Sequence, residues 1–180
     1  MLRTMRAAAV TISLAVLLCA LPASAAQVDP KGLVLQRSDV PANFRLDPAK
    51  SGVVPNSDVR DPSDPTFVSR AGRVTGYFVQ YVEPGAGSGL QSQVDMFRKP
   101  GGARMMLARV HQAWLKLAHG DPWGRVRIGN EGWFFGGQVD TAVYWRNGRA
   151  VGLVLGINLS KKRTLALARK QQRRIAAALG

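Results

Sequence analysis

The sequence predicts an α+β fold in which an antiparallel β-sheet carries two amphipathic helices packed on it. Residues 76–82 and 90–97 have the aromatic, β-branched and alternating character of strands. Residues 100–118, and the stretch that follows Ser160, instead place apolar side chains at helical spacing. Together with the later segments, the order is two strands, a helix, three strands and a helix, which is typical of an antiparallel sheet covered by helices.

The first 25 residues have the three parts of a cleavable signal peptide. Arg3 and Arg6 form a positively charged start, and an apolar run of about fifteen residues follows at 7–21. That run is short for a membrane span, which needs roughly 20 residues, although a retained membrane anchor is the alternative interpretation. We expect cleavage between Ala25 and Ala26, which leaves the mature chain outside the cytoplasm, periplasmic or secreted, and without a transmembrane helix.

The mature chain is expected to form one domain, 26–180. Its first part, 26–75, is irregular with short elements, and the α+β core follows at 76–180. About 155 residues can bury a sufficient core without disulfides. The single cysteine, Cys19, lies within the apolar part of the signal peptide, so no disulfide is expected in the mature domain.

The charge of the chain favours anionic partners. The formal net charge is +14 at pH 7, and loss of Arg3 and Arg6 with the signal peptide lowers it to about +12. The excess is greatest near the C-terminus, where no acidic residue follows Asp140. Such a field attracts lipid headgroups, nucleic acid or wall polymers. The alternative is an ordinary solvated surface.

The irregular segment is divided by turns. Asp-Pro pairs recur through it, and Asp58, Asp61 and Asp64 stand three residues apart. A calcium loop needs oxygen ligands at alternate positions, so this spacing fits turns better than a calcium site. A glycine-rich loop at 85–89 then joins the first two predicted strands.

The first predicted helix begins at Pro100 and runs to about residue 118. Its apolar stripe, which should face the core, consists of Met106, Val110, Ala113, Trp114 and Leu117.

A β-hairpin is predicted around Asn147-Gly148, because both residues tolerate the positive φ angles of a type I′ turn. Its second arm, 149–157, is apolar or small on both faces. We therefore expect that arm to be a central strand covered on both sides.

The terminal helix is predicted to start with Ser160 as its N-cap. One side is apolar, and the other side carries six basic residues across roughly 140°. These are the predicted binding residues of the helix: Lys162, Arg163, Arg169, Lys170, Arg173 and Arg174.

Two tryptophans in glycine-rich surroundings, Trp123 and Trp133, are predicted to face a ligand. The mature chain has few candidate catalytic side chains, with no thiol and only two imidazoles. His111 and His119 are eight residues apart, which does not match the i, i+4 spacing of a helical zinc site, and structural roles are expected for both. We predict no catalytic residues, no metal site and no cofactor.

Three short motifs carry a resemblance: Ser38-Asp39-Val40-Pro41-Ala42-Asn43-Phe44, Ile128-Gly129-Asn130-Glu131 and Arg146-Asn147-Gly148-Arg149. The chain resembles small exported bacterial domains of unknown function, some of which are similar to the Mog1/PsbP-like α+β sandwich. The resemblance spans residues 33–175. Many of those domains have an SDLPxGF start, a GDE turn and an RxGN hairpin. In this chain, Asn43 replaces the glycine of the first motif and Asn130 replaces the aspartate of the second. The resemblance implies a fold and a compartment, but no activity.

The leading hypothesis is a non-enzymatic, extracytoplasmic binding or accessory domain. Its expected partner is an anionic envelope component, either a lipid headgroup or a wall polymer. Nucleic acid suits the charge but not the compartment. The alternative function is a small exported hydrolase that would use His111, His119, Asp121 and Glu131. The sequence does not give the oligomeric state.

Overall fold

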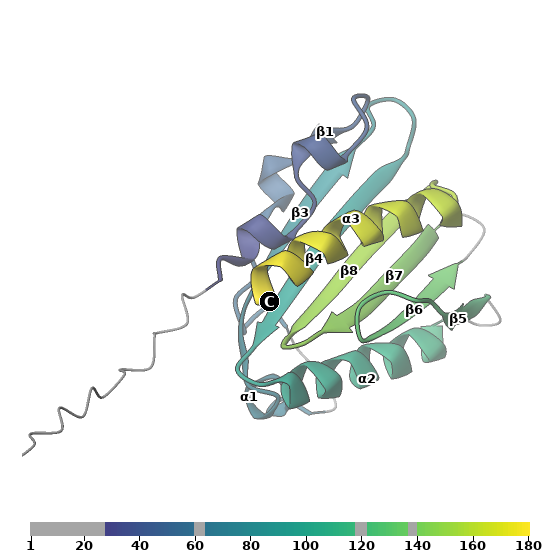
Figure 1. Ribbon diagram of the computed structural model, residues 1–180. Helices are drawn as coiled ribbons and strands as arrows, with labels where there is room; N and C mark the ends of the chain where they lie inside the picture. The colour runs from purple at the N-terminus through teal and green to yellow at the C-terminus, as the bar shows by residue number, and fades with distance from the viewer. Residues whose placement is uncertain (1–27, 60–63, 118–121, 137–139) are drawn as a thin grey trace, which may run out of the picture.

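The computed structural model describes residues 28–59, 64–117, 122–136 and 140–180 (Figure 1). The predicted signal peptide and its cleavage site lie outside these ranges, as do Asp61, His119 and Asp121.

All strands of the described residues belong to one antiparallel sheet. The strands are β1 (Arg45–Leu46), β2 (Gly52–Val53), β3 (Arg73–Val82), β4 (Gly89–Phe97), β5 (Trp123–Arg125), β6 (Glu131–Gly136), β7 (Asp140–Asn147) and β8 (Ala150–Ile157). Their order across the sheet is β1-β3-β4-β8-β7-β6-β5, and β2 also pairs with β3. Both predicted neighbours, β3 with β4 and β7 with β8, are confirmed as pairs.

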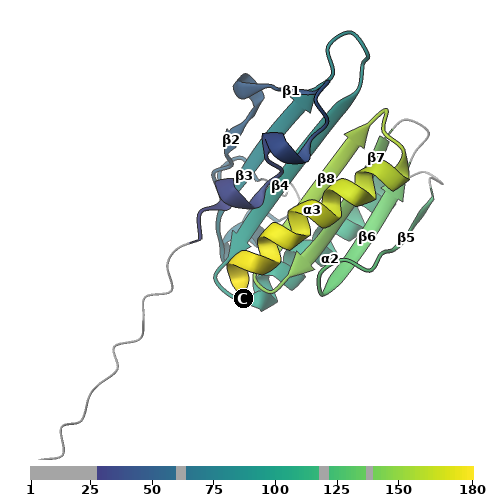
Figure 2. The same ribbon diagram turned by 45° about the horizontal axis from the view of Figure 1, so that its top comes forward.

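Helices cover both faces of this sheet. The α-helices are α1 (Phe67–Arg70), α2 (Pro100–Leu117) and α3 (Lys161–Leu179), and the 3-10 helices are η1 (Pro30–Leu33), η2 (Arg37–Asp39) and η3 (Pro48–Lys50). Figures 1 and 2 show α3 crossing one face and α2 lying against the other. The α+β class with an antiparallel sheet and helices packed on it is confirmed. None of the helices in the described ranges combines the length and the hydropathy that a membrane crossing requires.

A separate hydrophobic core lies on each face. The core under α3 includes Leu33, Val34, Leu35, Phe44, Val79, Leu90, Val94, Trp145, Val154, Leu167 and Ile175. The core under α2 includes Phe67, Val68, Phe97, Ala103, Met106, Leu107, Phe135, Tyr144 and Val151. Alternate residues of β8 enter the two cores, which confirms that this strand is central and covered on both sides.

Buried polar groups tie the N-terminal segment to the sheet and to α3. The hydroxyl of Ser92 on β4 accepts a hydrogen bond from the backbone N–H of Leu35 (3.0 Å) and donates one to Oε1 of Gln171 on α3 (2.8 Å). The Arg73 guanidinium forms an ion pair of 2.6 Å with Asp95, and Arg73 also donates to Oδ1 of Asn56 (2.7 Å). Each buried group thereby has the partner that burial demands.

The hairpin exists, but its turn differs from the prediction. Asn147 pairs with Ala150, so the turn residues are Gly148 and Arg149. Among the described non-glycine residues only Asn158 has a positive φ, whereas Gly148 has φ 54°. A positive φ at the first turn position alone is the pattern of a type II′ turn, so the predicted type I′ turn is wrong.

The helix that follows Pro100 is present with one correction to its stripe. Met106 is buried, and Val110 and Trp114 pack against the core. Ala113 is exposed, however, while Leu107, which the predicted stripe omits, is buried. The contact surface of α2 is therefore centred nearer Leu107 than the predicted stripe.

Candidate functional site

One end of the sheet gathers aromatic side chains beneath α2. Arg125 of β5 pairs with Trp133 of β6, and Trp133 pairs with Tyr144 of β7. Directly paired residues of neighbouring strands point to the same face, so these three side chains form a row. Two residues farther along these strands, Trp123 of β5 pairs with Phe135 of β6. Both side chains therefore lie on the same face as the row.

His111 of α2 closes over this row. Its imidazole stacks on the Trp133 ring with a centroid distance of 4.0 Å, and it meets the edge of Trp123 at 5.7 Å. Its Nδ1 lies 2.8 Å from the Tyr144 hydroxyl. Arg125 lies over the Trp133 ring, 4.8 Å from its centroid, as in a cation–π contact. We call Trp123, Arg125, Trp133, His111 and Tyr144 the aromatic edge.

Burial sets the protonation states in the aromatic edge. It raises the pKa of the Tyr144 phenol far above its usual range, so the hydroxyl keeps its proton. Burial also lowers the pKa of His111; the nearby Glu131 carboxylate opposes this effect and Arg125 adds to it. In the tautomer that carries its hydrogen on Nε2, the neutral imidazole accepts the Tyr144 proton at Nδ1, and Nε2 is then a hydrogen-bond donor.

Exposure decreases from the rim of the aromatic edge inward. The Trp123 side chain is 50 % exposed, and Arg125 is also exposed. Trp133 and His111 are half-buried, and Tyr144 is completely buried. The rim is therefore a rigid aromatic surface open to solvent.

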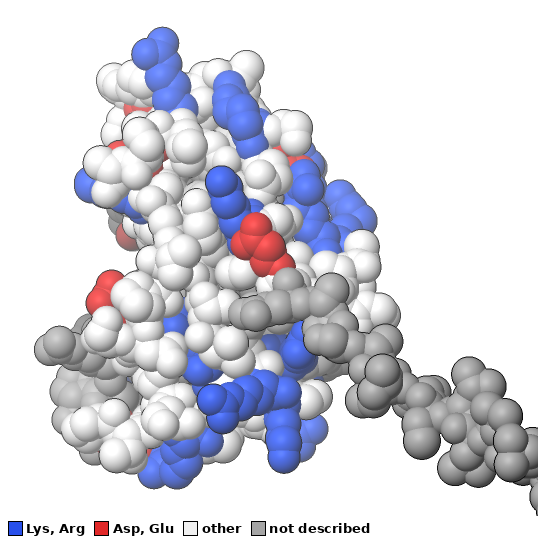
Figure 3. All heavy atoms as spheres, turned by 90° about the vertical axis from the view of Figure 1, so that its left-hand side faces the viewer, with Lys and Arg blue, Asp and Glu red and all other residues white. Residues whose placement is uncertain are grey.

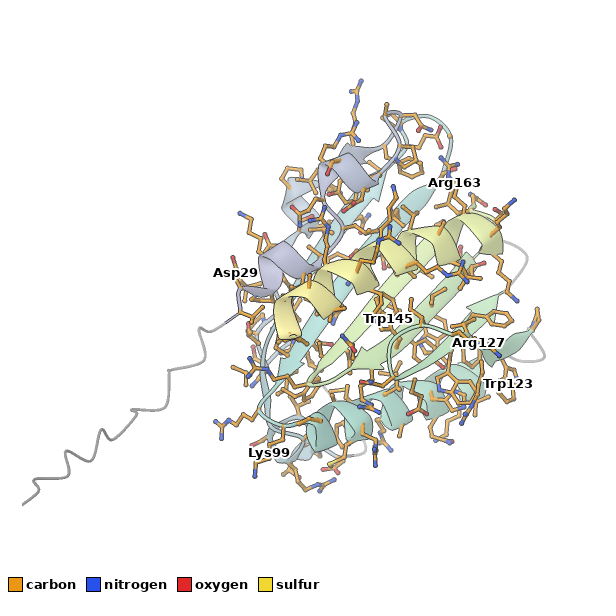
Figure 4. The ribbon with its side chains drawn as sticks, in the orientation of Figure 1. Asp29, Lys99, Trp123, Arg127, Trp145 and Arg163 are labelled. Atoms are coloured by element: carbon orange, nitrogen blue, oxygen red, sulfur yellow. The ribbon has the colours of Figure 1, made fainter. Side chains whose placement is uncertain are left out.

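A pocket adjoins the aromatic edge at the loop between β5 and β6. Its volume is about 890 Å³, and its lining consists of residues 125–132. Arg125, Arg127 and Glu131 are the charged residues of this lining, and Arg125 belongs to the aromatic edge as well. Figure 4 shows Arg127 and Trp123 at this same end of the molecule.

Two of the motifs that carried the resemblance meet beside the pocket. The Asn130 side-chain oxygen accepts a hydrogen bond from the Gly148 N–H (2.7 Å), and the Asn130 N–H donates to the Arg146 carbonyl (2.7 Å). Gly129 has φ 59°, and a Cβ there would collide with the Arg146 carbonyl oxygen. Both motifs therefore shape the loop that lines the pocket. The Mog1/PsbP-like resemblance itself stays a prediction.

The predicted basic residues of α3 divide into two groups. Four are exposed: Lys162, Arg163, Arg169 and Arg173. Three of these face away from the sheet, whereas Arg163 lies on the flank of the helix, with its guanidinium 5.8 Å from the centroid of the Phe44 ring. Ser160 caps the helix as predicted, and its hydroxyl accepts from the Arg163 N–H. Figure 4 labels Arg163 on this helix, and Figure 3 shows Lys and Arg side chains outnumbering carboxylates on another side of the molecule.

The other two basic residues fasten α3 to η2. Arg174 forms an ion pair with Asp39 (2.9 Å), and Lys170 donates to the Asp39 backbone carbonyl (2.7 Å). Burial alone would raise the pKa of the Asp39 carboxyl, but hydrogen bonds from Arg174 and the Gln36 N–H, with the charges of Arg174 and Lys170, outweigh it and lower the pKa below 3.8. These two cations therefore have structural partners.

The residues of the alternative hydrolase are only partly described. His111 has Tyr144 as its hydrogen-bond partner, and Glu131 acts on it through charge. His119 and Asp121 lie outside the described residues. Within the described ranges, no cluster of three or more His, Cys, Asp and Glu residues could hold a metal ion.

Sequence reasoning found Trp123 and Trp133 but missed their companions. The alternation of β5 and β6 could have placed Arg125 beside Trp123 on one face. His111 and Tyr144 join the site through the packing of α2 on β7, which no local pattern reveals.

No protein-family model and no curated protein matches the sequence. Among solved structures, the chain is similar to the extracellular domain of PknH from Mycobacterium tuberculosis, with a TM-score of 0.54 and 13 % sequence identity. The match covers 83 % of this chain and 97 % of the PknH domain. At that identity the likeness concerns the fold, and the chain therefore shares the overall architecture of the PknH extracellular domain.

Proposed function

We propose that the protein is a non-enzymatic binding or accessory domain that works outside the cytoplasm and binds an anionic component of the cell envelope. The observation that carries the proposal is the outer side of α3. Successive 100° steps place Lys162, Arg169 and Arg173 within an arc of about 40°. The helix contains no acidic residue, so nothing on it neutralises this row.

The proposed contact is electrostatic and needs no insertion into a bilayer. The apolar side of α3 is already used, because Leu167, Ala168 and Ile175 are buried against the sheet. Its outer side offers cations separated by small alanines such as Ala166 and Ala177. An interfacial helix would instead need large apolar side chains directed at the lipid.

The extracytoplasmic location is supported by two independent observations. The first 25 residues have the composition of a signal peptide. The PknH domain, which is similar in fold, is extracellular.

Binding of the purified protein to vesicles tests the proposal. Vesicles of phosphatidylglycerol and phosphatidylcholine are compared with pure phosphatidylcholine, with duplex DNA as a polyanion control. Each Lys or Arg near an anionic surface contributes about 1 kcal/mol. The fourfold glutamine variant of Lys162, Arg163, Arg169 and Arg173 should therefore lose binding to anionic vesicles by two to three orders of magnitude.

A matched variant separates this surface from net charge. Arg45, Lys50, Arg98 and Lys99 are also exposed but lie outside α3. Their replacement by glutamine removes the same charge and should reduce binding far less. Equal losses in both variants, or stronger binding to duplex DNA than to vesicles at physiological salt, would contradict the proposal.

A further inference from the structure

Trp123 is an exposed aromatic platform with a fixed orientation. Its indole lies 5.8 Å from the Trp133 ring and 6.3 Å from the Phe135 ring, and it also contacts His111. Half of the side chain nevertheless remains in water. An indole that is held on one side and open on the other offers a flat apolar face to a ligand at little cost in conformational entropy.

Charged groups follow this platform along β5, β6 and the loop between them. Trp123 and Arg125 are two residues apart on β5, which places their Cα atoms about 7 Å apart on one face of the sheet. The contact with Trp133 holds the Arg125 guanidinium in place. Arg127 and Glu131 line the pocket beside it. The site thus combines an apolar face, two cations and one carboxylate.

This combination matches the chemistry of an acidic sugar. A pyranose ring has an apolar face of C–H groups that stacks on indole. The hydroxyl groups of a neighbouring ring in the same oligosaccharide can donate hydrogen bonds to the Glu131 carboxylate, which lies about 13 Å farther along the strands. A carboxylate on the ring would pair with Arg125 or Arg127. The pocket of about 890 Å³ lies within the usual size range of small-ligand sites.

Nucleic acid fits the same residues less well. Its bases could stack on Trp123, but the phosphate backbone would pass close to the Glu131 carboxylate in the pocket. The carboxylate weakens the attraction of the two arginines for a phosphate on every nucleotide.

We propose that Trp123, Arg125, Arg127 and Glu131 form a carbohydrate-binding site for sugar rings that carry a carboxylate. The site lies apart from the outer side of α3, and it does not depend on the function proposed above.

Calorimetric titration with an oligogalacturonate tests the site, with a neutral malto-oligosaccharide of equal length as the comparison. The wild-type protein should bind the acidic oligosaccharide more tightly. Trp123→Ala should weaken binding of the acidic oligosaccharide at least tenfold, because it removes the stacking surface. Arg125→Gln should reduce the preference for the acidic oligosaccharide several-fold and leave much of the stacking.

Two controls keep the test specific. Met105→Ala and Arg104→Gln change exposed residues of α2, and they should leave binding unchanged. Near-ultraviolet circular dichroism reports whether each variant keeps its aromatic packing, and Trp123→Phe retains part of the platform should Trp123→Ala disturb it. The fourfold glutamine variant of α3 should bind the oligosaccharide normally, which separates this site from the vesicle-binding surface.

The proposal is overturned if the wild-type protein binds neither oligosaccharide, or if Trp123→Ala and Trp123→Phe both bind like the wild type. Equal affinity for the acidic and neutral oligosaccharides would remove the role of the arginines. Tighter binding of single-stranded DNA than of oligogalacturonate would assign the site to a different ligand class.

Discussion

Tyr144 determines the state of His111 in the aromatic edge. The phenol is completely buried and keeps its proton, which it donates to Nδ1 of the imidazole. A protonated imidazole has no acceptor nitrogen, so protonation of His111 would leave the buried Tyr144 proton without this acceptor, and Nδ1 could then only donate to the phenol oxygen. Arg125 opposes that protonation through its charge, whereas Glu131 favours it.

His111 should make stability depend on pH. Because burial lowers its pKa from 6.5, the unfolded chain takes up the proton first as pH falls. The stability that neutral His111 contributes is complete above about pH 6.5 and should decline as pH drops toward the folded pKa. His111→Gln keeps an acceptor for Tyr144 without titrating, so chemical denaturation at pH 7.5 and 5.5 should show a smaller loss in this variant. An equal loss in both proteins would contradict the assignment.

At the residue scale, the sequence predicted the two tryptophans of the site and missed the exposed Arg125 and the buried Tyr144. Trp123 and Trp133 stand out because glycines flank large aromatic rings. In the sequence, Tyr144 looks like an ordinary strand residue. It belongs to the site because it pairs with Trp133 of the neighbouring strand and its hydroxyl contacts His111. The turn was misassigned because Asn147 pairs with Ala150 and is the last residue of β7, so the two turn residues are Gly148 and Arg149.

The helix α3 uses its cations for two purposes. Lys170 and Arg174 hold η2 through Asp39, whereas Lys162, Arg169 and Arg173 remain exposed on the outer side. The division follows from position around the helix, since the first two point toward the N-terminal segment. The net charge of the helix does not distinguish the cations with structural partners from the exposed ones.

Asp39→Asn should loosen this attachment. The variant loses the ion pair with Arg174, which we expect to cost about 1 kcal/mol of unfolding free energy at pH 6. The pKa of Asp39 is lowered from 3.8, so its contribution is present above that pH and disappears as pH falls through the folded pKa. Urea denaturation at pH 6 and pH 3 should show the difference between wild type and variant shrinking at the lower pH. A difference that persists unchanged at pH 3 would argue against the charge pairing.

At the element scale, helical periodicity predicted which side of α3 faces away from the sheet. It did not predict which residues elsewhere in the chain contact the helix. The 100° repeat places Lys162, Arg169 and Arg173 opposite the buried Leu167 and Ile175. The other three basic residues fall on the flank of the helix: Arg163, Lys170 and Arg174. It cannot show that Gln171 is buried, because the polar partner that makes burial acceptable, Ser92, lies on β4. Likewise, helical periodicity predicted that Ala113 is buried, whereas the packed side of α2 is centred nearer Leu107 and leaves Ala113 exposed.

The whole molecule is one sheet between two cores, and its two ends differ. At one end, β1 and β2 come from the segment that reads as irregular, and buried residues such as Leu35 and Phe44 complete a core there. At the other end, the three-residue β5 presents Trp123 to solvent. The sequence predicted the middle of the sheet because β3, β4, β7 and β8 are long and regularly patterned. The short edge strands carry too few residues for a pattern.

The central position of β8 has a consequence for how the protein opens. Strand β8 has neighbours on both edges and a core on both faces, whereas β5 pairs with β6 alone. Backbone amides exchange with solvent only when their hydrogen bonds break, so amides of β8 should require global unfolding while those of β5 exchange through local fraying. Hydrogen–deuterium exchange measured by mass spectrometry should find β8 and β4 slowest and β5 among the fastest. The proposed sugar site would then lie on an edge of the sheet that opens locally, and bound oligosaccharide should slow exchange there without altering β8.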